Sequence, residues 1–68
     1  MCVENAGNEV SLWIGKVYQV IKPHPNDGSH NLRVIDEDGE DYLYSDDQFV
    51  PVELPQAARR AVVAASKN

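Results

Sequence analysis

Runs of branched and aromatic residues alternate with polar turns along this chain and predict a series of short β-strands. The longest run, residues 12–21 (LWIGKVYQVI), has the composition of a strand and contains no proline. Gly15 interrupts it, and an isolated glycine inside a strand often marks a bulge or a bend. We therefore expect one bent strand that is long enough to contribute to both sheets of a small barrel.

A polar loop and a hairpin are expected next. Residues 22–31 (KPHPNDGSHN) contain two prolines and an Asn-Asp-Gly-Ser run, which favour turns and prevent strand pairing. Residues 32–35 and 41–44 are predicted to form the strands of the hairpin, with Asp38-Gly39 in the turn between them. After a short polar loop, residues 49–53 are predicted to form a further strand.

The two ends of the chain differ from this central part. Residues 1–11 are mostly polar, and we expect a loose tail there. Pro55 suits the first turn of a helix because it has no N–H to lose, and the alanine-rich residues after it have a high helix propensity. The predicted helix spans residues 55–68, and one of its faces is formed by Leu54 just before it together with Ala58, Ala61, Val62 and Ala65. We expect this face to close an open end of the barrel or to pack on a partner chain.

The segment YSDDQFVPV, which begins at Tyr44, resembles the end of an SH3 domain. In that family a short helical turn leads into the last strand, and Phe49-Val50 stand where the family has Tyr-Val. Residues 12–54 as a whole are similar to small bacterial proteins with an SH3-like barrel. The resemblance implies a mainly β fold, an SH3-like barrel of four to five strands with a C-terminal α-helix. It does not imply binding of proline-rich peptides, because the family's Ala-Leu-Tyr-Asp-Tyr opening and its tryptophan after the hairpin are absent from the sequence.

The composition limits the chain to one small acidic domain. A length of 68 residues leaves room for a single domain. Eleven acidic residues against six basic ones give a net charge of −5, which repels phosphate backbones and disfavours nucleic-acid binding. No run approaches the roughly 18 apolar residues of a membrane span, so we expect no membrane association. Cys2 is the single cysteine, which suits a cytoplasmic protein.

Motifs for nucleophilic catalysis, phosphate binding and zinc are absent from the sequence. We therefore expect a non-enzymatic interaction or regulatory module without a cofactor, either a monomer or a weak homodimer. Tyr42 and Tyr44 lie on one face of their strand and Leu43 on the other. If Leu43 faces the core, the tyrosines form an exposed aromatic surface that binds a peptide or a cationic group; otherwise they cover the core. The predicted contacts for a basic protein partner are Tyr42, Tyr44, Phe49, Asp38 and Glu40.

A second hypothesis is a metal-binding or metal-responsive protein. Two imidazoles and a carboxylate in one loop, from His24, Asp27 and His30, are ligand types that transition metals accept. The acidic hairpin around Asp38 and Glu40 offers oxygen ligands for calcium, although its spacing does not match an EF-hand. The histidine spacing is not a recognised metal-binding pattern either, and the interaction module is the preferred hypothesis.

Overall fold

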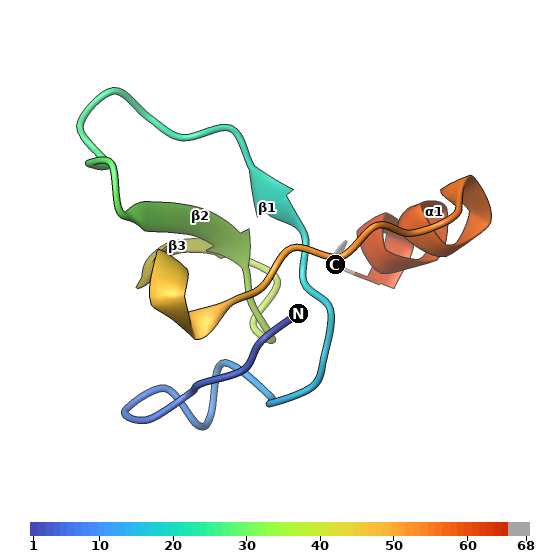
Figure 1. The fold of residues 1–68 in the computed structure, drawn as a ribbon, viewed down its shortest axis with the longest axis horizontal. Coiled ribbons are helices and arrows are strands. Elements are labelled where there is room, and N and C mark those ends of the chain that lie inside the picture. Colours follow the sequence, from blue (N-terminus) through green and yellow to red (C-terminus); the bar gives the residue numbers. More distant parts are fainter. Residues whose placement is uncertain (66–68) are drawn as a thin grey trace.

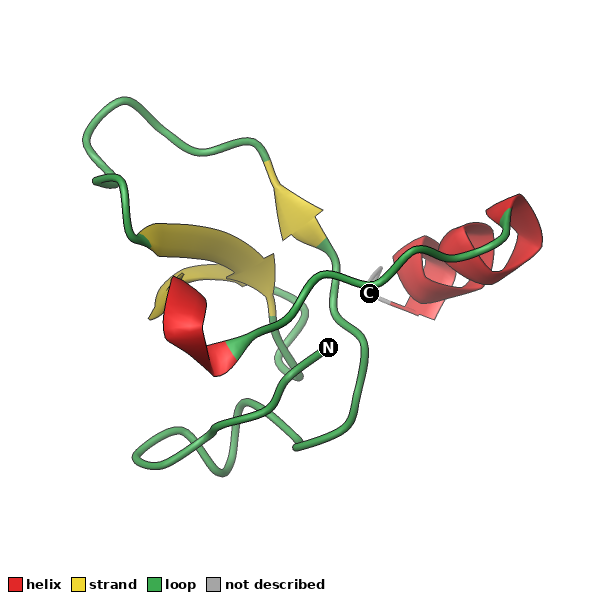
Figure 2. Cartoon of the chain, in the orientation of Figure 1, coloured by secondary structure: helices red, strands yellow, loops and turns green. Residues whose placement is uncertain are grey.

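The computed structural model describes residues 1–65, which form an open antiparallel sheet of three strands and one α-helix (Figure 1). The strands are paired in the order β1-β2-β3. The elements are β1 (Val20–Ile21), β2 (Asn31–Ile35), β3 (Asp41–Ser45), the 3-10 turn η1 (Asp46–Gln48) and α1 (Gln56–Ala65). Loops make up much of the remaining chain, as Figure 2 shows. The last residues of the predicted helix, 66–68, lie outside the described residues.

The central hairpin is confirmed. β2 and β3 pair over their whole length, with Leu32 opposite Tyr44 and Val34 opposite Tyr42. Gly39 adopts a φ of 77° in the connecting turn, a conformation that glycine reaches without steric cost. The short helical turn expected after β3 is also present as η1.

The prediction of a closed barrel with four to five strands is wrong, because two of the expected strands do not form. Within residues 12–21 only Val20–Ile21 pair with β2. At Gly15 the chain turns instead of bending: its φ is 85°, and the N–H of Lys16 donates to the carbonyl of Trp13 at 3.2 Å. This turn takes the first half of the run away from the sheet.

The strand expected at residues 49–53 is also missing. Phe49 forms a single isolated bridge with Cys2, and the segment then crosses from η1 to α1 without further pairing (Figure 1). Pro51 contributes to this outcome because it has no N–H to donate to a neighbouring strand. The sheet therefore stays open at both edges, and the fold is mixed α/β.

The core lies on one face of the sheet and is completed by the N-terminal segment. The buried apolar side chains among residues 1–65 are Cys2, Leu12, Val34 and Tyr44. Residues 1–11 are therefore part of the fold, in contrast to the loose tail that we expected. The backbone N–H of Cys2 donates to the backbone carbonyl of Lys16 at 2.8 Å, and the backbone N–H of Gly15 donates to the carbonyl of Cys2 at 2.7 Å.

Gln48 ties the N-terminal segment to the end of the sheet. Its side chain is buried, accepts the N–H of Ser45 at 3.2 Å and donates to the carbonyl of Glu4 at 3.3 Å. The backbone carbonyl of Gln48 accepts a hydrogen bond from the backbone N–H of Val3 at 2.8 Å. A buried amide side chain is stable only when its polar atoms are paired, so these bonds fix both η1 and the N-terminal segment.

Helix α1 stands to one side of the sheet (Figure 1). None of its residues is buried, and Ala58 and Val62 are half-buried on its inner side. The expected closure of a barrel end by this helix is therefore wrong, since there is no barrel to close. No helix within residues 1–65 combines the length and the apolar character needed to cross a membrane.

Replacing Leu12 with alanine tests the role of the N-terminal segment. Leu12 is fully buried, so Leu12→Ala should lower the free energy of unfolding by about 2–5 kcal/mol, measured by urea denaturation. Val10→Ala is the control, because Val10 is exposed and should leave the midpoint nearly unchanged. Equal midpoints for the two variants would mean that this segment does not belong to the core.

Candidate functional site

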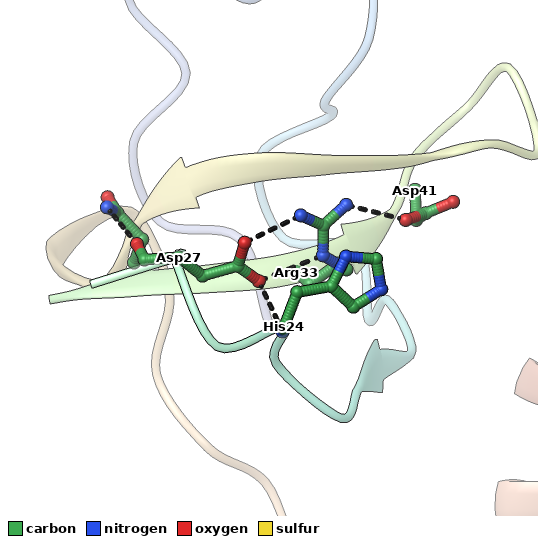
Figure 3. A network of polar contacts seen from close by, with 5 residues as sticks. His24, Asp27, Arg33 and Asp41 are labelled. Carbon is green, nitrogen blue, oxygen red and sulfur yellow. Dashed lines mark hydrogen bonds and ion pairs between the residues drawn. The ribbon is translucent and has the colours of Figure 1, made fainter. Parts of the chain in front are cut away.

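An ionic network on the outer face of the sheet organises the long loop between β1 and β2 (Figure 3). Arg33 on β2 donates to Asp27 through Nε at 2.9 Å and through Nη2 at 2.7 Å, and to Asp41 through Nη1 at 2.7 Å. Asp27 also accepts the backbone N–H of His24 at 2.8 Å. Asp27 is buried and Arg33 half-buried, so the guanidinium and the carboxylate hold the loop against the sheet.

The charges in this network shift one another's titration. Hydrogen bonds from Arg33 lower the pKa of Asp27 from 3.8 to about 2, and they also lower the pKa of Asp41. The same carboxylates raise the pKa of Arg33. The network is therefore fully ionised at neutral pH, and its positive charge is surrounded by the two acidic side chains.

The residues of the predicted metal site do not converge. Asp27 uses both carboxylate oxygens on Arg33, and His24 joins the network through its backbone N–H (Figure 3). His30 is exposed, and its Nδ1 lies 3.7 Å from Oδ2 of Asp46. In the described part of the chain, no group of three or more His, Cys, Asp or Glu side chains is arranged to hold a metal ion.

The predicted aromatic surface is divided between the core and solvent. Tyr44 is only 8% exposed, and Phe49 packs edge-on against it with the ring centroids 6.2 Å apart. Tyr42 is 51% exposed, while Leu43 lies on the outer face and is exposed as well. The tyrosine face of β3 is thus the core face, and of the two alternatives the covering role applies to Tyr44.

A buried hydrogen bond explains this orientation. The hydroxyl of Tyr44 donates to Asp36 at 2.6 Å, and Asp36 also accepts the N–H of Asp38 at 2.9 Å. Burial, and next the bond to Asp36, raise the pKa of Tyr44 to about 12. Leucine in the same position would bury no hydroxyl and would leave the Asp36 carboxylate without this donor.

Much of the acidic hairpin is used inside the fold. Asp36 accepts a hydrogen bond from Tyr44, and Asp41 accepts one from Arg33. Glu37 accepts a hydrogen bond from the ammonium group of Lys16 at 2.6 Å. The predicted partner contacts Asp38 and Glu40 are exposed near the turn. The hairpin is therefore only in part a solvated acidic surface.

A groove of about 950 Å³ with many apolar side chains in its lining lies between the sheet, the crossing segment and α1. Its floor includes Val20 of β1 and Leu32 of β2, and Phe49 lies beside them. The crossing segment contributes one wall through Val50 and Val52, and α1 contributes the other through Val62 and Val63. Val20, Val50, Val52 and Val63 are all exposed to solvent.

Sequence reasoning missed most of this groove. It assigned residues 49–53 to a strand inside a barrel and oriented the helix by a face that contains Val62 but not Val63. The available signal was Pro51, which disfavours a paired strand. Phe49 is the one predicted contact residue that lines the groove.

Comparisons with known proteins leave the function to be argued from this geometry. No family model, curated protein or solved structure matches the chain. The groove and the charged clusters are therefore the observations on which any assignment must rest.

The Arg33 network predicts a specific acid sensitivity. Because the pKa of Asp27 is lower in the folded state, its contribution to stability is present above pH 3.8 and is lost as the pH falls through about 2. Asp27→Asn should lower the melting temperature by several degrees at neutral pH and should show a smaller further drop on acidification than the wild type. Asp47→Asn, at an exposed carboxylate, should follow the wild-type pH profile. Parallel profiles for Asp27→Asn and the wild type would contradict the network.

The Tyr44–Asp36 pair predicts the opposite dependence at high pH. The pKa of Tyr44 is raised from 10.0, so its contribution is complete below pH 10 and is lost as the pH rises through about 12. Tyr44→Phe should cost about 1–3 kcal/mol at neutral pH because Asp36 loses a buried donor. Its melting temperature should then fall less steeply above pH 10 than that of the wild type. Tyr42→Phe, at an exposed hydroxyl, should retain the wild-type profile.

Proposed function

We propose that this protein is a non-enzymatic interaction module whose groove binds an apolar segment of another protein that also carries basic residues. The observation that carries the proposal is the groove itself, where four exposed valines gather around the half-buried Phe49. Exposed apolar surface that is rimmed by polar residues is a feature of protein-binding sites. The single cysteine is in keeping with action in the cytoplasm.

The net charge of the chain favours a basic segment as the occupant. The charged groups of the groove lining balance one another, with Asp46 and Glu53 against Arg59 of α1 and the N-terminal ammonium of Met1. The whole chain carries a net charge of −5, so its field attracts a basic partner and repels an acidic one. Apolar contacts in the groove would supply affinity, and the field of the whole chain would favour a basic partner.

The proposal uses a different set of contact residues from the one predicted from the sequence. Phe49 remains a contact residue because it lines the groove. Tyr44 supports the site from the core, through its contact with Phe49. Tyr42, Asp38 and Glu40 are not part of the groove lining, and they would act at most on the approach of a charged partner.

A matched pair of valine variants tests the proposal. Val52 lines the groove and is 42% exposed, while Val3 lies outside it and is 40% exposed. The wild type, Val52→Asp and Val3→Asp are each immobilised, and the proteins that bind to each of them are identified. Each candidate partner is then purified and titrated calorimetrically against all three. We expect Val52→Asp to weaken binding at least tenfold and Val3→Asp to have little effect.

Two further measurements complete the test. The affinity of the wild type should fall as salt is raised, because exposed charges attract the partner. Sedimentation of the wild type alone decides whether a second copy of the chain occupies the groove instead. Equal affinity of Val52→Asp and Val3→Asp for the partner would place the interface outside the groove.

A further inference from the structure

Lys16 places its ammonium group among two aromatic rings and a carboxylate. Its Nζ lies 4.9 Å from the ring centroid of Trp13 and 5.3 Å from that of Tyr18, within the range of cation–π attraction. The same Nζ lies 2.6 Å from Oε2 of Glu37. Two aromatic faces and one carboxylate are the groups that proteins use to recognise ammonium ions.

Hydrogen bonds that do not involve the Lys16 side chain connect the backbone of Trp13 with Tyr18 and Glu37. The backbone N–H of Trp13 donates to the hydroxyl of Tyr18 at 2.8 Å, and that hydroxyl donates to Oε2 of Glu37. The N–H of Glu37 donates to the carbonyl of Ser11 at 3.0 Å. Partial burial of Glu37 opposes its ionisation, but hydrogen bonds from Lys16 and Tyr18 outweigh it and lower its pKa. The hydrogen bond from Tyr18 still anchors the Glu37 side chain if the lysine side chain moves away.

A pocket lies directly beside this cluster. It has a volume of about 330 Å³, within the range of small-molecule sites, and Lys16, Tyr18 and Glu37 are part of its lining. Its remaining walls are largely apolar and come from the sheet and from α1. They include Val17, Ile35, Ala61, Val62 and Ala65. The apolar walls of the pocket thus adjoin the side chains that surround the positive charge.

From this arrangement we infer that Trp13, Tyr18 and Glu37 form a binding site for an external ammonium group on a short apolar stem, and that Lys16 occupies this site in the free protein. The ammonium replaces that of Lys16 between the rings, and the stem lies in the adjoining pocket. Two sources supply this chemistry: a free alkylamine, or the lysine side chain of a peptide. This inference does not depend on the function proposed for the groove, although Val17, Tyr18 and Val62 line both hollows.

Lys16 acts as an internal competitor in this scheme. Its side chain is 42% exposed, and its four-carbon stem is flexible, so it leaves the site without unfolding the chain. If Lys16 fills the site in about nine molecules of ten, the apparent Kd for an external ammonium rises about tenfold. Removing the Lys16 ammonium should therefore strengthen binding, which is the opposite of what loss of a contact residue would do.

The experiment compares the wild type with Lys16→Met, which keeps an apolar stem and removes the charge. Trp13 is the single tryptophan, so its fluorescence reports on this site, and calorimetry provides a second readout. The probes are butylammonium, Nα-acetyl-lysine amide and the uncharged butanol. We expect Lys16→Met to bind butylammonium about tenfold more tightly than the wild type and to bind butanol far more weakly. Binding of the lysine amide as well would identify a peptide lysine as a source, and its failure would leave the free amine.

Three controls make the outcome decisive. Lys22→Met removes an exposed lysine elsewhere and should titrate as the wild type does. Adding Glu37→Gln to Lys16→Met should abolish the gain, while circular dichroism confirms the fold of each variant. Lys16→Gln is measured in parallel in case Lys16→Met is unstable. The inference is overturned if no folded Lys16 variant binds butylammonium better than the wild type, or if butanol binds equally well.

Val52→Asp separates this site from the groove. It should leave butylammonium binding by the Lys16→Met variant unchanged, because Val52 is outside the lining of the smaller pocket. If this variant no longer binds the protein partner but still binds butylammonium, the result would support two independent sites. Loss of ammonium binding in this combined, folded variant would contradict the separate site.

Discussion

The docking of the N-terminal segment onto one face of the sheet is the constraint on which the rest of the structure depends. A sheet of three strands, one of them two residues long, cannot close on itself or bury its own apolar face. Cys2 and Leu12 provide half of the four buried apolar side chains in residues 1–65. Gln48 secures this cover with bonds to both Val3 and Glu4, and the edge-on contacts of Phe49 with Tyr18 and Tyr44 complete it.

The opposite face of the sheet is stabilised by charge instead of apolar packing. Arg33 on the central strand bonds Asp27 from the long loop and Asp41 from β3, so one guanidinium joins three parts of the chain. The bidentate ion pair between Arg33 and Asp27 fixes the orientation of the loop as well as its distance from the sheet. The loop in turn leads from β1, which pairs with β2 through only Val20 and Ile21.

Local patterns predicted the hairpin and the helix because both depend on contacts between neighbours in sequence. The Asp38-Gly39 turn, the alternation in β2 and the alanine-rich stretch after Pro55 each indicate one structure. The orientation of β3 was not predictable in this way. Alternation places Tyr42 and Tyr44 on one side, but the choice of the core side depends on the bond between Tyr44 and Asp36. Sequence spacing also gave no sign that Arg33 would bind Asp27 and Asp41.

The same limit applies to the two candidate sites. The groove combines Val20, Leu32, Val52 and Val63, which no periodic pattern connects, and it exists because Pro51 and Gly15 each end an expected strand. The ammonium site was missed for a related reason. Trp13 lies in the run of residues 12–21 that was predicted to be a strand, whereas the turn at Gly15 leaves it 56% exposed beside Lys16. Glu37 comes from a hairpin that is distant in sequence.

The internal ion pairs determine how the acidic charge of the chain is expressed. The pairing of Lys16 with Glu37 is locally neutral, whereas Arg33 with Asp27 and Asp41 leaves one negative charge on the outer face of the sheet. The remaining negative charge of the chain, whose net charge is −5, lies on the rest of the surface, which includes Asp46 and Glu53 beside the groove. Arg59 on α1 and the N-terminal ammonium of Met1 offset these two charges locally. A basic ligand thus gains from long-range attraction at either site, and apolar contact then distinguishes between them: a broad groove suits a protein segment, and a small pocket suits a single ammonium stem.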